Sequence, residues 1–120
     1  MTQEKDLKEY TPAEIQVALR SETLNVTPDI LARWRRRLAA EYAFYTEQMK
    51  AVMIKKQEKW TEIRQRDDIK SDTQADMRWA QTPEGRAEIE YKWELKKLEK
   101  LISALNQEAE MISREWGFQE

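Results

Sequence analysis

The chain has 120 residues, of which 37% are charged, and its formal net charge is −2. It contains no Cys and no His, which excludes disulfides, Cys/His zinc sites and the Ser-His or Cys-His pairs of nucleophilic catalysis. Only two Gly and three Pro are present, too few for the frequent turns of most β folds, so the composition favours long helices joined by few loops.

No stretch of the sequence approaches 18 consecutive apolar residues, the length that a membrane-spanning helix needs. The first residues also lack the basic region and apolar run of a signal peptide. We therefore expect a cytoplasmic protein that does not enter a membrane.

Three helix starts are marked by the same dipeptide, because each proline, at Pro12, Pro28 and Pro83, follows a threonine. Threonine accepts a hydrogen bond from a free backbone N–H at a helix N-terminus, and proline fits the first helical position. An acidic residue follows in each first turn, where the helix dipole favours negative charge. We predict that a helix begins at each proline.

The first predicted helix covers residues 12–21, and the second covers residues 28–66. Apolar residues in the second recur every three or four positions between Leu31 and Val52, which is helical spacing. The polar stretch 67–72 is predicted to end it. The apolar face of the first helix is expected to consist of Ile15, Ala18 and Leu19.

A short connecting helix is predicted over residues 73–80, capped by Ser71 or Asp72, with Met77 and Trp79 as its buried side chains. Together with the predicted helices on either side of it, this segment indicates a chain that reverses direction once.

The last predicted helix covers residues 83–116 and contains the clearest pattern of the chain. Its apolar residues alternate steps of four and three, the seven-residue repeat of a coiled coil. The predicted core or oligomer seam consists of Tyr91, Leu95, Leu98, Ile102, Leu105, Ala109, Ile112 and Trp116. The predicted fold is all-α: a single domain, residues 1–120, forming a long antiparallel, coiled-coil-like helical hairpin with a short N-terminal helix and a short connecting helix.

Large apolar side chains also occur away from these seams, and a hairpin of two helices buries only one stripe on each helix. Such exposed side chains usually mark association surfaces, which predicts a homo-oligomer. The alternative is that the short helices fold back and cover them within one chain. The off-seam residues are Phe44, Met53, Trp60, Trp79, Trp93, Leu101 and Met111.

Positive charge is concentrated in residues 28–70, which carry 11 basic and 7 acidic side chains, whereas residues 71–120 carry 7 and 11. The densest cluster is Arg33-Trp34-Arg35-Arg36-Arg37. One interpretation is a solvated face whose arginines pair with the acidic last helix. The other is contact with phosphates, for which arginine is well suited.

A second basic cluster surrounds Trp60 near the expected end of the hairpin. Positive charge around an aromatic ring suits single-stranded nucleic acid, whose bases stack and whose phosphates pair with cations. The alternative is a charged helix surface with Trp60 in the core. The predicted nucleic-acid-binding residues are Lys55, Lys56, Lys59, Trp60, Arg64 and Arg66.

Carboxylates four residues apart occur at Glu84/Glu88, Glu90/Glu94 and Asp72/Asp76, but helical dimetal sites usually combine Glu with His. No nucleotide-binding or nucleophile motif is present. We expect no metal, no cofactor, no small-molecule substrate and no enzymatic activity.

The layout resembles that of UvsY-like phage recombination mediator proteins over roughly residues 28–118. A basic-leaning helix is followed by a polar break containing Lys70-Ser71-Asp72-Thr73, a helix beginning Arg86-Ala87-Glu88-Ile89-Glu90, and a closing Trp116-Gly117-Phe118. The resemblance implies an oligomeric ring that binds single-stranded DNA and helps to load a recombinase onto strands coated by a single-strand-binding protein. The rival hypothesis is a coiled-coil adaptor, or a phage structural or assembly protein, without nucleic-acid binding.

Overall fold

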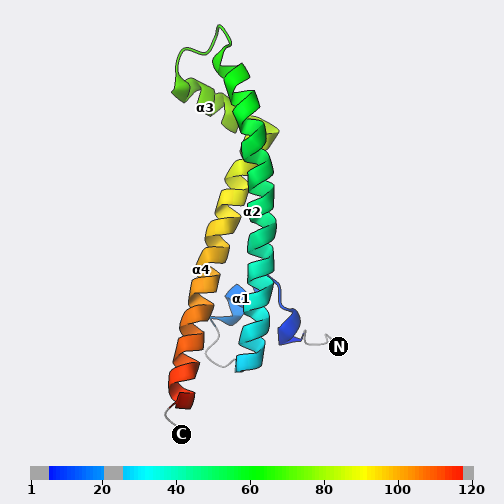
Figure 1. Ribbon diagram of the computed structural model, residues 1–120, viewed down its shortest axis with the longest axis vertical. Coiled ribbons are helices and arrows are strands. Elements are labelled where there is room, and N and C mark those ends of the chain that lie inside the picture. The colour runs from blue at the N-terminus through cyan, green and yellow to red at the C-terminus, as the bar shows by residue number, and fades with distance from the viewer. Residues whose placement is uncertain (1–5, 21–25, 118–120) are drawn as a thin grey trace. The chain divides into compact units, whose positions relative to one another are not determined.

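The computed structural model describes residues 6–20 and 26–117, with side chains described as far as Arg114. Within these residues the chain forms a 3-10 turn η1 (Leu7–Glu9) and four α-helices, and no strand occurs. The helices are α1 (Pro12–Ala18), α2 (Pro28–Arg64), α3 (Asp72–Ala80) and α4 (Pro83–Gly117), as Figure 1 shows. The predicted all-α antiparallel helical hairpin is confirmed.

Three helices begin at the prolines, and a threonine side chain caps each start. Thr11 and Glu14 form a reciprocal capping box, in which Thr11 Oγ1 accepts from the Glu14 backbone N–H at 3.3 Å. Thr27 Oγ1 accepts from the Ile30 N–H at 3.3 Å, and Thr82 Oγ1 accepts from the Gly85 N–H at 3.0 Å. These bonds satisfy backbone donors that have no partner inside a helix.

The chain divides into two compact units. Unit 1 comprises Met1–Tyr42 and Lys97–Glu120, and unit 2 comprises Ala43–Lys96. Both α2 and α4 contribute to each unit.

Unit 1 is organised around Trp34 on α2, whose side chain is fully buried. Its indole Nε1 donates to the carbonyl oxygen of Leu7, and its ring stacks on Tyr10 with centroids 5.7 Å apart. Lys8 forms an ion pair with Asp29 at 3.1 Å. The N-terminal segment is thereby held on the first turns of α2.

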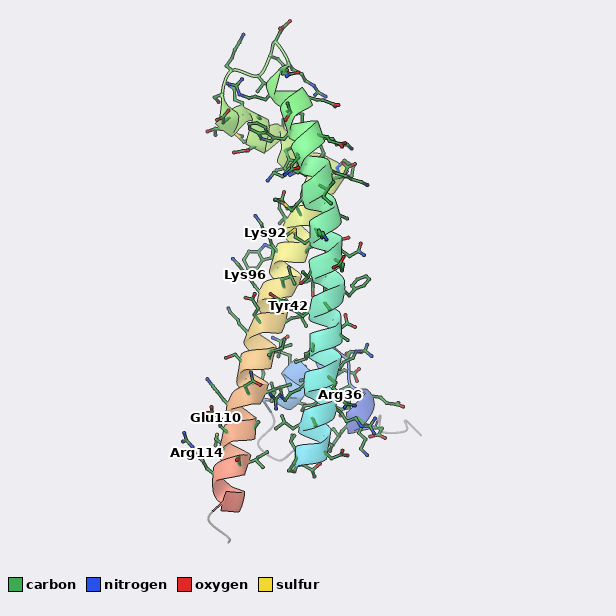
Figure 2. The ribbon with its side chains drawn as sticks, viewed as in Figure 1. Arg36, Tyr42, Lys92, Lys96, Glu110 and Arg114 are labelled. Carbon is green, nitrogen blue, oxygen red and sulfur yellow. The ribbon has the colours of Figure 1, made fainter. Side chains whose placement is uncertain are left out.

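In unit 1, α2 and α4 run antiparallel and share a leucine core. Tyr42, labelled in Figure 2, donates its hydroxyl hydrogen to Glu99 at 3.0 Å, while Leu31 near the start of α2 lines a groove with Ile112 near the end of α4. The buried leucines are Leu31, Leu38, Leu98, Leu101 and Leu105.

The seam of α4 is wider than the heptad pattern predicted. Leu98 and Leu105 are buried as expected, but Leu101 was placed off the seam and is only 8% exposed, whereas the neighbouring seam residue Ile102 is half-buried. Unit 1 also contains α1 with its buried Ile15, and a third packed helix buries a broader stripe than a two-helix contact. The side chain of Trp116 lies outside the described residues.

Unit 2 has its own apolar cluster, formed where α3 meets α2 and α4. Its buried members are Val52, Ile63, Ile69, Ala75 and Trp79, and Tyr91 packs against them. Trp79 was predicted both as an off-seam residue and as the buried residue of α3, and it is buried. Met77 was also expected to be buried, but it is 62% exposed, so that prediction is wrong. Met77 lies two residues before Trp79 and therefore projects from a different side of the helix.

Gly85 allows α4 to begin directly against the end of α3. A Cβ atom at this position would lie 1.9 Å from the carbonyl oxygen of Trp79, a backbone atom that cannot rotate away. The close approach therefore requires glycine, although the helical backbone itself does not.

Candidate functional site

A buried carboxylate, Glu88 on α4, joins the three helices of unit 2. Its side chain is 5% exposed and accepts hydrogen bonds from Trp79 Nε1 on α3 at 2.6 Å and from Lys56 Nζ on α2 at 3.0 Å. Lys92 Nζ lies 3.7 Å away. A buried charge is tolerated when it is paired and hydrogen-bonded in this way.

The charge of Glu88 is maintained by these partners. Burial by itself raises the pKa of Glu88, but the hydrogen bonds from Trp79 and Lys56 and the positive charges of Lys56 and Lys92 outweigh it, so the pKa lies below its usual value. Glu88 is therefore ionised at neutral pH and acts as a structural anchor between helices.

Two more of the predicted DNA contacts are engaged in ion pairs inside unit 2. Lys59 donates to Glu84, and this hydrogen bond is the main reason that the pKa of Glu84 is lowered. Arg64 Nε donates to Asp72 at 2.8 Å, which links the end of α2 to the start of α3. Both pairs are partly exposed, and such pairs contribute little stability each.

Trp60 takes part in the packing of unit 2 and also lines a groove. Its ring packs against the apolar cluster of unit 2, and its Nε1 donates to Asp76 Oδ1 at 2.8 Å. The residue remains half-buried. Part of the indole thus contacts other residues of unit 2, and Trp60 also lines a groove.

This groove is a concave surface of about 590 Å³ between α2 and α3. It is lined by Lys50, Met53, Ile54, Lys56, Gln57, Trp60, Thr61 and Asp76. Lys50 is exposed and forms no ion pair with any residue that the structure describes. The same holds for Lys55 and Arg66, two of the four predicted DNA contacts that do not line the groove.

Unit 2 also exposes large apolar side chains that its core does not use. Trp93 is the most exposed ring among them, at 62%, and Lys96 Nζ lies 5.3 Å from its centroid. Figure 2 labels Lys92 and Lys96 on α4. The other exposed members in this unit are Phe44, Met53, Ile54, Met77 and Ile89.

Most of the predicted DNA contacts already have hydrogen-bond or ion-pair partners within unit 2. Of the six predicted DNA contacts, Lys56, Lys59 and Arg64 have acidic partners and Trp60 has Asp76. Trp60 was the ring predicted to stack on a base, with core packing as the alternative, but Trp93, predicted as an off-seam residue, is the more exposed ring. The exposure of Trp93 could have been predicted from its position opposite the heptad seam of the last helix.

No group of three acidic side chains is placed to hold a metal ion within residues 6–20 and 26–117. Over the same residues, no helix has the length and apolar character needed to cross a membrane. The chain matches no protein-family model, no curated protein and no solved structure.

Proposed function

We propose that this protein acts as a helical association module, in which unit 2 binds another protein chain and a second copy of the chain is the first partner. The observation that carries this proposal is the exposure of Trp93, Ile54 and Phe44, each more than half accessible. Large exposed apolar side chains are among the features that mark interaction sites.

These side chains are not needed to complete the fold. The apolar cluster around Trp79 and the Glu88 hydrogen bonds already fix α3 against α2 and α4. A largely exposed tryptophan contributes less to folding than a buried one, whereas aromatic side chains contribute strongly at interfaces. Trp93 and the groove beside Trp60 are therefore the parts of unit 2 best suited to contact a partner.

Light scattering at micromolar concentration tests self-association. The wild type should have at least twice the monomer mass, and the combined variant Ile54→Gln, Trp93→Gln should have a lower mass at the same concentration. The matched control is Val17→Gln, Met111→Gln, because these residues of unit 1 are similarly exposed, at 69% and 56%. A wild type that is monomeric and fully helical would contradict the proposal.

Single-stranded DNA binding in phage-type recombination is the second candidate function. It is favoured by the groove beside Trp60 and by the cations Lys50, Lys55 and Arg66, which have no ion-pair partner among the described residues. The layout resemblance to UvsY-like mediators points the same way. This function ranks second because half of the predicted DNA contacts already pair with acidic residues of the same chain.

The test of this second function is the combined change of Lys55, Lys56 and Lys59 to Ala. Each of these side chains that binds a phosphate adds about 0.7 to the salt slope of single-strand binding, so the slope should fall by that amount for each one removed. A variant whose salt slope equals that of the wild type would show that none of the three lysines binds a phosphate.

A further inference from the structure

The most concentrated positive charge of the chain lies in unit 1, not beside Trp60. Arg33, Arg35, Arg36 and Arg37 are all exposed on α2, and no acidic residue occurs between Asp29 and Glu41. Figure 2 labels Arg36 on this part of the helix. We call Arg33, Arg35 and Arg36 the arginine surface.

The arginine surface is held in place by Trp34. Because Trp34 is fully buried, stacked on Tyr10 and bonded to Leu7, the rotation of this part of α2 is fixed. The arginines on either side of it in the sequence consequently project outwards. Arg33 and Arg36 are three positions apart, so they lie on the same side of the helix.

The acidic residues at the two ends of this segment are paired with basic residues other than those of the arginine surface. Lys8 pairs with Asp29 at 3.1 Å, and Arg37 pairs with Glu41 at 3.5 Å. The three residues of the arginine surface form no ion pair with any residue that the structure describes. For these three arginines, the described part of the acidic last helix supplies no partner.

Arg35 also borders a groove of about 330 Å³ between α2 and α4 within unit 1. The other lining residues are Pro28, Leu31, Ala32, Ala109, Ile112 and Ser113, none of which is acidic. An anion that approaches Arg35 from this side therefore meets a hydroxyl and apolar groups, and none of the described lining residues carries a carboxylate that would repel it.

We infer that the arginine surface binds the phosphate backbone of nucleic acid. Guanidinium groups pair with phosphate oxygens through two parallel N–H donors, and this contact needs no apolar surface. Protein interfaces, in contrast, have an apolar core. On the α2 segment of unit 1, none of the described residues is an exposed large apolar side chain, in contrast to unit 2.

Among the residues whose side chains the structure describes, this surface offers no ring on which a base could stack. Trp34 is buried, and Tyr10 is stacked against it. Binding through phosphates alone does not depend on unpaired bases. The arginine surface should therefore bind duplex DNA at least as tightly as a single strand of the same length.

The experiment measures fluorescence anisotropy of a short labelled duplex, and of one of its strands, titrated with the full-length protein between about 50 and 200 mM salt. The combined variant Arg33→Gln, Arg35→Gln, Arg36→Gln should lower the salt slope by about 2.7 for the duplex and about 2.1 for the single strand, since it removes three phosphate-binding groups. The matched control Arg86→Gln, Lys100→Gln, Arg114→Gln removes the same charge from exposed positions of α4 and should leave the duplex slope unchanged. Circular dichroism checks that both variants keep the wild-type helix content.

Several results would overturn the inference. These are a wild type that does not bind DNA at about 50 mM salt, an arginine variant that binds duplex like the wild type, or equal decreases of the slope in both variants. Single-strand binding without duplex binding would also overturn it. If poly-glutamate displaces the duplex at equal charge concentration, the surface recognises carboxylates of an acidic protein and the phosphate assignment is wrong.

Discussion

The indole Nε1 of Trp79 donates a hydrogen bond to Oε2 of Glu88 over 2.6 Å, and both side chains are buried. Lys56 binds the other carboxylate oxygen of Glu88. One acidic side chain therefore connects α3, α4 and α2, and the stability of unit 2 should depend on it.

Replacing Glu88 by Gln should lower the free energy of unfolding by about 2–3 kcal/mol, because Lys56 and Trp79 lose a charged acceptor in a buried position. Urea denaturation measures the change. Glu90→Gln is the control, since Glu90 is exposed on the same helix. A Glu88→Gln variant as stable as this control would show that the hydrogen bonds contribute nothing to folding.

Stability should also fall on acidification. The pKa values of Glu88 and Glu84 are lowered in the folded state, so the unfolded chain binds protons more readily. Their contribution is present above the pKa of an unfolded glutamate, about 4.3, and is lost as the pH falls through the lower folded values. Urea midpoints measured from about pH 6 down to pH 3 should fall less steeply for Glu88→Gln than for the wild type. Parallel curves for the two proteins would exclude Glu88 as a contributor.

Gly85→Ala should destabilise the chain by about 1–3 kcal/mol, as overpacking does elsewhere, although alanine has the higher helix propensity. The added Cβ would collide with the carbonyl oxygen of Trp79 and separate α3 from α4. Ser103→Ala, at an exposed position of α4, is the control and should be neutral or slightly stabilising. Thermal unfolding of both variants distinguishes the clash from the propensity effect, and a stabilised Gly85→Ala variant would rule out the clash.

Trp60→Phe and Trp60→Ala separate packing from recognition at one residue. Trp60→Phe removes the hydrogen bond to Asp76 and should cost about 1 kcal/mol of stability, while Trp60→Ala also removes the half-buried ring from the apolar cluster and should cost about 2–3 kcal/mol. If a base stacks on the ring, Trp60→Ala should weaken single-strand binding by about 1–3 kcal/mol and Trp60→Phe should retain most of it. Equal DNA affinity in folded samples of all three proteins would exclude stacking at Trp60.

The sequence alone determined where the helices begin and which class of fold they form. Each Thr-Pro start depends only on groups within one helical turn, as the bonds at Thr11, Thr27 and Thr82 illustrate. The burial of Leu98 and Leu105 was also predictable, because a seven-residue repeat fixes which side of a helix is apolar.

Only the tertiary structure decided which charged side chains have ion-pair partners and which rings are exposed to solvent. Lys56, Lys59 and Arg64 look equivalent to Lys55 in the sequence, but they lie opposite Glu88, Glu84 and Asp72 once the helices pack. Likewise, Leu101 is buried while Met77 and Trp93 are exposed. Helical periodicity gives the direction of each side chain from its own axis, whereas partners and exposure depend on how residues distant in sequence are brought together by packing.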